Sequence, residues 1–185
     1  MSEEIKNVQE ELNEQMQIRR DKLAEYEADG IYPFGQRFVV KDYAKDIKED
    51  FFLKYDGQPV VIAGRLMTIR SHGKTAFANI RDKSGDIQVY FRKDVLGEDA
   101  YKYVKMLDIG DIMGVEGHVF KTHTGEVTIK VNKLTLLSKS LRPLPEKWHG
   151  LKDTELRYRQ RYVDLIVNPE VRDTFVNRSQ IVAKI

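Results

Sequence analysis

The chain has no cysteine among its 185 residues, which excludes disulfide bonds and metal sites built on thiolates. Long apolar runs are also missing, because no stretch approaches the roughly 20 apolar residues of a membrane-spanning helix. The first residues, MSEEIKNVQEE, are acidic and lack the apolar segment of a signal peptide. We therefore expect a cytoplasmic protein that has no membrane partner.

Motifs for metals and nucleotide cofactors are missing as well. The four histidines include no pair with the spacing of metal ligands on one helix or hairpin, so we expect no metal site. There is no Walker-type phosphate loop, and the glycines at 110, 114 and 117 do not form a dinucleotide fingerprint. We therefore expect this chain to carry no cofactor of its own.

Charge is nearly balanced overall, with a formal net charge of +2, but it is unevenly distributed. Residues 1–58 carry 9 basic and 14 acidic side chains, whereas residues 59–140 carry 13 basic and 9 acidic ones. The positive middle is compatible with a phosphate-bearing partner, although an ordinary solvated surface has the same composition. The 41% hydrophobic content is sufficient for a core.

Three consecutive strands are predicted between residues 59 and 93, because apolar and polar residues alternate there with period two. In the second strand, residues 76, 78 and 80 form an apolar face, and Phe77 is an aromatic residue on the opposite, polar face. The third strand alternates in the same way and places Gln88 and Tyr90 in a second polar row beside Phe77. A face of this kind suits a flat, hydrogen-bonding, anionic partner such as single-stranded nucleic acid.

The remaining pattern completes a five-stranded barrel. Helical spacing over residues 97–108 is followed by strand patterns over 111–122 and 126–137, and Gly64 inside the first strand indicates a bulge or a tight coil of the sheet. This order predicts a mainly β (α+β) protein with a five-stranded Greek-key OB-fold. The expected parts are an N-terminal amphipathic helix at 1–30, a connector with a possible short helix (43–50) at 31–58, the OB-fold at 59–140, and a linker with further helix at 141–185.

The N-terminal helix has two possible roles. Its apolar residues recur every three or four positions, as in a helix that packs one stripe on a neighbour and shows charge to water. Alternatively, Arg19, Arg20 and Lys22 contact a phosphate backbone. The pattern alone leaves both roles open.

Four segments carry a resemblance to a known family. They are GKTAFANIRDKSGDIQVY at 73–90, LRPLPEKWHGLKD at 141–153, RYRQRYVDLIVN at 157–168 and RSQIVAKI at 178–185. Because they occur in order across almost the whole chain, the sequence resembles the bacterial lysyl-tRNA synthetases, a family of class II aminoacyl-tRNA synthetases. The resemblance implies an anticodon-binding OB-fold followed by the truncated start of a class II catalytic domain.

The resemblance also implies properties of a longer enzyme. The full-length protein is expected to attach lysine to tRNA(Lys), to use ATP and Mg²⁺, and to form a homodimer. The class II ATP-binding motifs are not in this sequence, so we expect the fragment to be inactive alone. A helical pattern that begins near Val171 still continues at Ile185, which suggests a fragment whose next domain has been removed.

The resemblance places the anticodon uridines on Phe77, Gln88, Arg70 and Glu126, and it assigns no catalytic residue to this chain. Phe77 offers a ring on which a base can stack. A carboxylate such as Glu126 can accept the N3–H of uracil while Gln88 or Arg70 donates to a carbonyl, and cytosine lacks that N3–H. Weaker candidates for RNA contact are His72, Asn79, Tyr90 and Lys130.

Structural alternatives exist for each of these residues. Phe77 can be covered by the N-terminal helix or a loop, Gln88 and Arg70 can be ordinary surface residues, and Glu126 can simply follow a glycine turn. The alternation of side chains along the first strand does not determine on which face Arg70 lies, because a bulge near Gly64 shifts the register. Three other functions stay open: a single-strand-binding OB module without base preference, a dimerisation module, and an aspartyl or asparaginyl relative.

Overall fold

The computed structural model describes residues 2–145 and 153–185. The chain divides into two compact units, residues 1–143 and 144–185, and each is described by itself. Much of the predicted linker and of the motif at 141–153, including Trp148 and His149, lies outside the described residues. No described helix is both long and apolar enough to cross a membrane.

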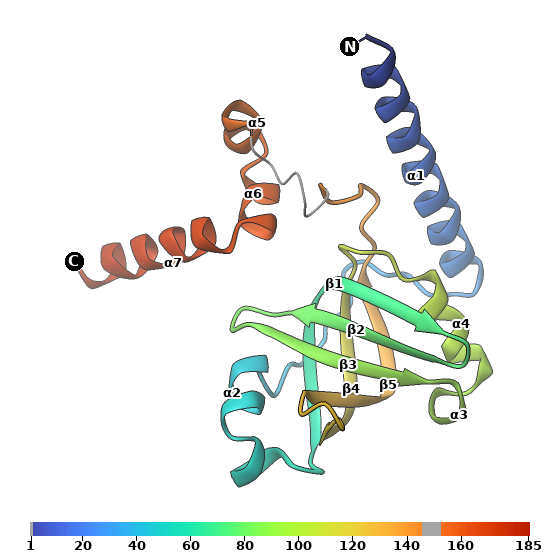
Figure 1. Cartoon of the computed structure of the whole chain (residues 1–185), viewed down its shortest axis with the longest axis vertical. Helices are drawn as coiled ribbons and strands as arrows, with labels where there is room; N and C mark the ends of the chain where they lie inside the picture. Colours follow the sequence, from blue (N-terminus) through green and yellow to red (C-terminus); the bar gives the residue numbers. More distant parts are fainter. Residues whose placement is uncertain (1, 146–152) are drawn as a thin grey trace. The chain divides into compact units, whose positions relative to one another are not determined.

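Five strands close into a barrel, which confirms the predicted OB-fold. The order around the barrel is β1, β2, β3, β5, β4, and β4 pairs again with β1. The β3–β5 pair is parallel and the other pairs are antiparallel (Figure 1). The strands are β1 Pro59–His72, β2 Thr75–Arg81, β3 Asp86–Arg92, β4 Ile112–Lys121 and β5 Val127–Ser138.

Alternation along the strands fills the barrel as the sequence predicts. In β2 and β3, every second residue is buried and its neighbours are partly or fully exposed. These inward residues are Ala76, Ala78, Ile80, Ile87, Val89 and Phe91. Because the apolar residues point inward, the polar and aromatic residues of both strands stand on the outer face.

The first strand coils at Gly64, but its register shifts further along. Residues 59–65 of β1 pair with β4, and residues 65–72 pair with β2. A Cβ at Gly64 would lie 2.8 Å from the carbonyl oxygen of Arg81, so the two backbones can approach only because residue 64 is glycine. The tight coil is therefore confirmed, whereas the register irregularity lies between Leu66 and Thr68.

Two short helices, α3 (Lys93–Leu96) and α4 (Glu98–Met106), follow β3. The helix predicted over residues 97–108 is thus confirmed, and α3 is an additional turn before it. Tyr101 and Val104 of α4 are buried in the core. The helices therefore connect β3 to β4 while adding apolar side chains to the barrel.

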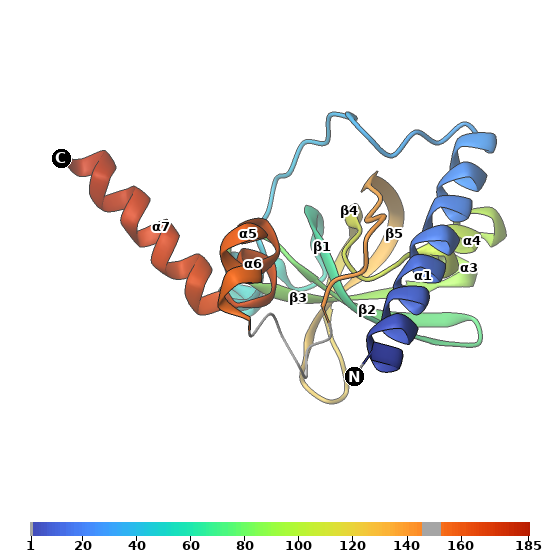
Figure 2. The same ribbon diagram turned by 90° about the horizontal axis from the view of Figure 1, so that it is seen from above.

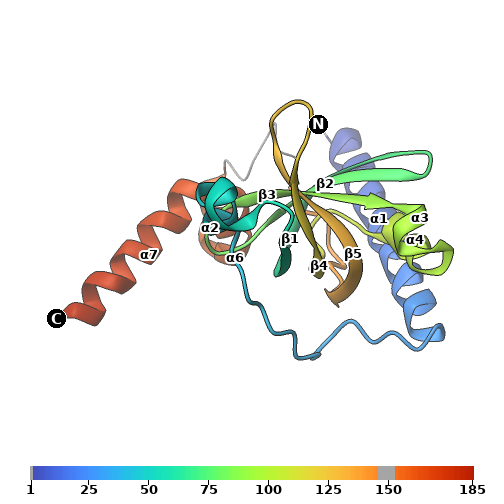
Figure 3. The same cartoon turned by 90° about the horizontal axis from the view of Figure 1, so that it is seen from below.

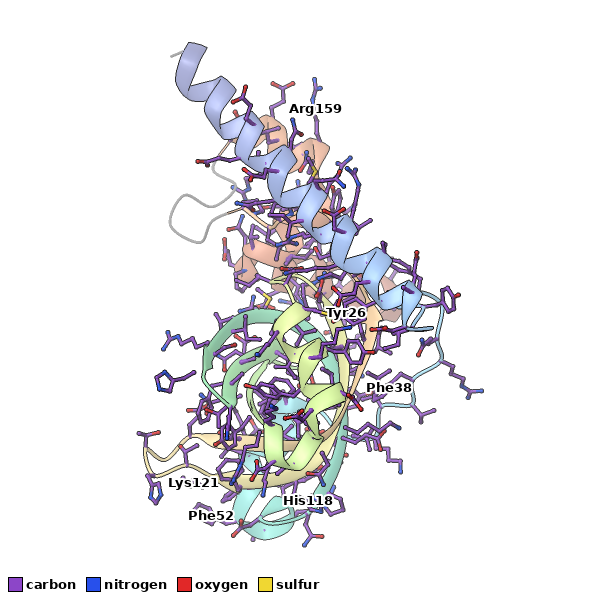
Figure 4. All side chains as sticks on the ribbon, turned by 90° about the vertical axis from the view of Figure 1, so that its right-hand side faces the viewer. Tyr26, Phe38, Phe52, His118, Lys121 and Arg159 are labelled. Atoms are coloured by element: carbon purple, nitrogen blue, oxygen red, sulfur yellow. The ribbon has the colours of Figure 1, made fainter. Side chains whose placement is uncertain are left out.

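The N-terminal helix α1 (Ser2–Ala28) is held by polar contacts near its C-terminal end. Arg19 is 8% exposed, and its Nη1 donates to the carbonyl oxygen of Ser140 at 2.8 Å. Lys22 Nζ lies 2.6 Å from Asp108 Oδ1, and the Tyr26 hydroxyl donates to the carbonyl oxygen of Tyr103 (Figure 4). Arg19 and Lys22 are therefore anchors of α1, and the phosphate-contact hypothesis is wrong for these two residues.

Two apolar side chains of α1 are exposed, Leu12 at 37% and Ile18 at 47%. Polar contacts from α1 to the barrel unit include Arg19, Lys22 and Glu25, whose Oε1 lies 2.8 Å from Lys102 Nζ, and Tyr26 adds an aromatic contact. Tyr26 is 1% exposed and stacks on Tyr103 with 5.2 Å between ring centroids. Attachment of α1 therefore depends on a buried polar cluster and one aromatic residue.

Two buried side chains form the centre of that cluster. Lys139 Nζ lies 2.7 Å from Asp111 Oδ2 and also contacts Asp108 Oδ2. Asp111 and Lys139 are both buried, and Asp111 also accepts hydrogen bonds from the backbone N–H groups of Asp108 and Ser140. The cluster thereby joins the segment before β4 to the segment after β5.

Acid should weaken this anchor. Burial disfavours ionisation of the Asp108 carboxyl, but hydrogen bonds and charge from Lys139 and Lys22 outweigh that penalty and lower its pKa. A carboxyl with a lower pKa in the folded state stabilises the fold above its unfolded pKa of about 3.9, and this stabilisation is lost as the pH falls through the lower folded value. We expect the free energy of unfolding to decline below about pH 4.

The measurement is urea unfolding between neutral and acid pH. Asp108→Asn should flatten the acid decline, because its side chain no longer titrates. Asp94→Asn is the matched control, since Asp94 is also ion-paired but its side chain is 62% exposed. An acid decline that persists unchanged in Asp108→Asn would contradict this assignment.

The segment at residues 31–58 contributes to the core as well as linking α1 to β1. Its first part runs outside the strands (Figure 2). It then forms α2 (Ala44–Glu49), which confirms the predicted short helix, and the π-helix η1 (Phe51–Tyr55). The backbone N–H of Val61 in β1 donates to Asp42 Oδ2 at 3.0 Å. Ile47 and Phe51 are buried in the same cluster as the strand residues.

The second unit contains three helices, α5 (Thr154–Arg159), α6 (Arg161–Val167) and α7 (Pro169–Lys184). The helical pattern predicted from near residue 171 is confirmed by α7. Asp164 is fully buried and accepts hydrogen bonds from Arg157 Nε at 2.9 Å and Asn168 Nδ2 at 2.6 Å. These bonds connect the three helices through one carboxylate.

Candidate nucleic-acid interface

An open groove of about 520 Å³ lies on the outer face of the barrel. Strands β1, β2 and β3 form its floor, and the turn between β4 and β5 borders it. Figure 3 shows this turn extending beyond the strands. The lining residues are Thr68, Arg70, Ser71, His72, Phe77, Ala78, Asn79, Gln88, Thr122, His123 and Thr124.

Strand register brings the predicted residues into two neighbouring rows. Arg70, Phe77, Tyr90 and Lys130 are opposite one another on β1, β2, β3 and β5. A second row contains Thr68, Asn79, Gln88 and Thr128 on the same strands. Directly opposed residues share a face of the sheet, so the structure places Arg70 on the same face as Phe77.

Phe77 presents a supported ring to the groove. Its ring stacks on that of Tyr90 with 4.4 Å between centroids and 20° between planes, and Phe77 remains 37% exposed. The ring centroids of Tyr90 and Phe120 are 6.2 Å apart. Phe120 therefore extends the aromatic row to β4. A base stacked on the exposed part of Phe77 would therefore meet a ring that is held in place from below.

A hydrogen bond to its side-chain oxygen holds Gln88 in place. The hydroxyl of Thr128 on β5 lies 2.8 Å from Gln88 Oε1, and Thr128 itself is fully buried. The two residues are adjacent because β3 and β5 pair in parallel with Gln88 opposite Thr128. Gln88 thus enters the groove from a fixed position on its floor.

Arg70 is the cationic residue of the groove floor. It is exposed, and no acidic side chain of the described residues lies within ion-pair distance of its guanidinium. Among the weaker candidates, Asn79 also lines the groove. Tyr90 and Lys130 do not line it, but they lie beside the groove in the row that contains Arg70 and Phe77. The groove can thus offer cationic, amide and aromatic contacts together.

Glu126 occupies a different position from the other predicted residues. Its Oε1 lies 3.2 Å from Lys48 Nζ of α2, and it is not among the groove-lining residues. The turn before it includes Gly125, whose φ of 87° favours glycine. The Glu126 side chain is 47% exposed, and its second carboxylate oxygen has no ion-pair partner among the described residues.

Two histidines border the groove. His72 is the last residue of β1, where a loop residue is expected from the sequence, and His123 lies in the turn between β4 and β5. The candidate that the sequence offered next to that turn was Glu126, and His123 was not among the predicted residues. Thr122 and Thr124 beside His123 were missed as well, because periodicity gives no signal for side chains in a turn.

The closed five-stranded barrel, with an aromatic and polar groove beside the turn between β4 and β5, has the architecture of an OB-fold. Residues 60–137 match the family model described as OB-fold nucleic acid binding domain. Relatives that match nearly the whole chain are lysine–tRNA ligases, and the chain is a homologue of these proteins.

Three of these relatives illustrate the coverage. The lysine–tRNA ligase of Syntrophomonas wolfei is 57% identical over 171 residues, which is 92% of this chain and 34% of that protein. That of Carboxydothermus hydrogenoformans is 57% identical over 176 residues, covering 95% and 36%. That of Thermoanaerobacter pseudethanolicus is 53% identical over 185 residues, covering 100% and 37%. The chain spans about a third of the length of these curated relatives.

Proposed function

We propose that residues 59–140 bind the anticodon stem-loop of tRNA(Lys) as part of a lysine–tRNA ligase. The observation that carries the proposal is the groove in which the exposed ring of Phe77 adjoins Gln88 and Arg70. Aromatic rings and amide groups on an OB-fold face suit unstacked single-stranded bases. The similarity to lysine–tRNA ligases supports this choice over an aspartyl or asparaginyl relative.

The remaining properties belong to the same proposal. The enzyme would attach lysine to tRNA(Lys) in the cytoplasm, act as a homodimer, and use ATP and Mg²⁺ held outside this chain. In the described residues, no three His, Asp or Glu side chains gather as metal ligands. We assign residues 1–30 and 31–58 to the helix and connector, and 141–185 to a linker and the start of a catalytic domain that is inactive alone.

Each groove residue has a proposed role toward uridine. A uracil ring stacks on Phe77, Gln88 donates to a uracil carbonyl, and Arg70 donates to a second carbonyl or a phosphate. Glu126 accepts the N3–H through its carboxylate. His72, Asn79, Tyr90 and Lys130 contribute weaker contacts at the border.

The test compares two anticodon stem-loops that differ only at the middle anticodon base. We expect the chain to bind the UUU stem-loop about 10-fold or more tightly than the UCU stem-loop, because a polar site rejects a base whose groups it leaves unpaired. Fluorescence anisotropy with each labelled RNA measures both affinities. Equal affinities, with a steep dependence on salt, would instead indicate a single-strand-binding module without base preference.

A further inference from the structure

The Thr128 hydroxyl lies under the binding face and has two possible acceptors. Gln88 Oε1 is 2.8 Å from Thr128 Oγ1, and the carbonyl oxygen of Glu126 is 3.2 Å from it. A hydroxyl carries only one proton, so it donates to one acceptor at a time. The acceptor that receives this proton determines whether the N–H groups or the oxygen of the Gln88 amide face the groove.

The Glu126 carbonyl already has other donors. It accepts the backbone N–H of Thr122 at 3.0 Å and lies 3.3 Å from the Thr122 hydroxyl. Gln88 Oε1 is also nearer to Thr128 than this carbonyl is. The shorter hydrogen bond runs from the Thr128 hydroxyl to Gln88 Oε1, and in this arrangement the amide N–H groups of Gln88 are at the groove end of the side chain.

The orientation of this amide distinguishes two bases. Uracil has the carbonyl O4 where cytosine has an amino group, and both lie on the base-pairing edge. An outward-facing Gln88 N–H group can donate to O4 but opposes the cytosine amino group. A rotated amide would present Oε1, which could accept from cytosine.

We propose that Thr128 is a positioning residue that holds Gln88 with its N–H groups toward the groove and thereby makes the site prefer uracil over cytosine. This inference rests on the proposed function. It adds a residue that is fully buried, does not line the groove and acts only through Gln88. The parallel β3–β5 pairing supplies the contact, because it places Thr128 directly opposite Gln88.

The test measures the UUU-to-UCU affinity ratio in Thr128→Val, which keeps the side-chain shape and removes the hydroxyl. We expect the ratio to fall by about 3- to 10-fold, the equivalent of one hydrogen bond of about 1 kcal/mol. Thr128→Ser should retain the wild-type ratio. Because each ratio compares two RNAs on one protein sample, a change in the folded fraction cancels.

A double-mutant cycle separates positioning from a purely structural role. In a Gln88→Ala background, Thr128→Val should leave the ratio unchanged, since no amide remains to be oriented. Thr135→Val on the same strand is the matched control and should keep the wild-type ratio. Equal affinities in the wild-type chain would overturn the proposed function together with this inference. A wild-type ratio above one that survives in Thr128→Val would overturn this inference alone.

Discussion

Phe77→Ala is expected to weaken binding of the UUU stem-loop by about 5- to 150-fold, which corresponds to the 1–3 kcal/mol typical of a base stacked on an aromatic ring. The ring is 37% exposed at the groove, and Tyr90 supports it at 4.4 Å. Alanine removes the stacking surface and leaves Gln88 and Arg70 in place. The loss should therefore affect the UUU and UCU stem-loops to a similar degree.

Fluorescence anisotropy with both RNAs measures the effect, and circular dichroism verifies that the variant is folded. Phe52→Ala is the matched control, because Phe52 is 77% exposed but lies on η1 and does not line the groove. Figure 4 shows Phe52 near Lys121, which lies 4.8 Å from the Phe52 ring centroid. If Phe52→Ala weakened binding as strongly as Phe77→Ala, stacking in the groove would not be the cause.

Asp111→Ala is expected to have the largest effect on stability, a loss of about 3–5 kcal/mol in the free energy of unfolding. The carboxylate is fully buried and accepts hydrogen bonds from two backbone N–H groups and from Lys139 Nζ. Its removal leaves the buried Lys139 ammonium with the Asp108 carboxylate and the Met106 carbonyl. An incompletely paired buried charge carries a large desolvation penalty.

Urea unfolding at neutral pH measures this loss. Glu116→Ala is the control, because Glu116 pairs with Lys133 at 2.8 Å while both side chains are solvent-exposed, at 40% and 67%. The expected loss for this exposed pair is below about 1 kcal/mol. Similar losses in the two variants would show that the buried cluster does not anchor the barrel and α1.

The sequence predicted much of the barrel, because period-two alternation is a local property of each strand. The inward residues of β2 and β3, the turns between strands and the helix after β3 could all be read from residue order. Phe77 was identifiable for the same reason, since an aromatic residue on a polar strand face breaks the pattern. Gln88 followed from the register of one short hairpin.

Other features depend on contacts between distant parts of the chain. The face that carries Arg70 was undetermined until the irregularity between Leu66 and Thr68 was located, because one extra residue moves every later side chain to the other face. The partners of Arg19 and Lys22 lie between 86 and 123 residues away, so the sequence pattern left packing and phosphate contact open for this helix.

Local order in the sequence thus determined the strands, their inward faces and the aromatic residue that marks the binding face. Tertiary structure decided how that face is completed. The parallel pairing of β3 with β5 joins Gln88 to a buried Thr128 forty positions later, and it brings the turn containing His123 to the groove while Glu126 pairs with Lys48. Such contacts are fixed by barrel closure, because they depend on which strands become neighbours rather than on the pattern within any one strand.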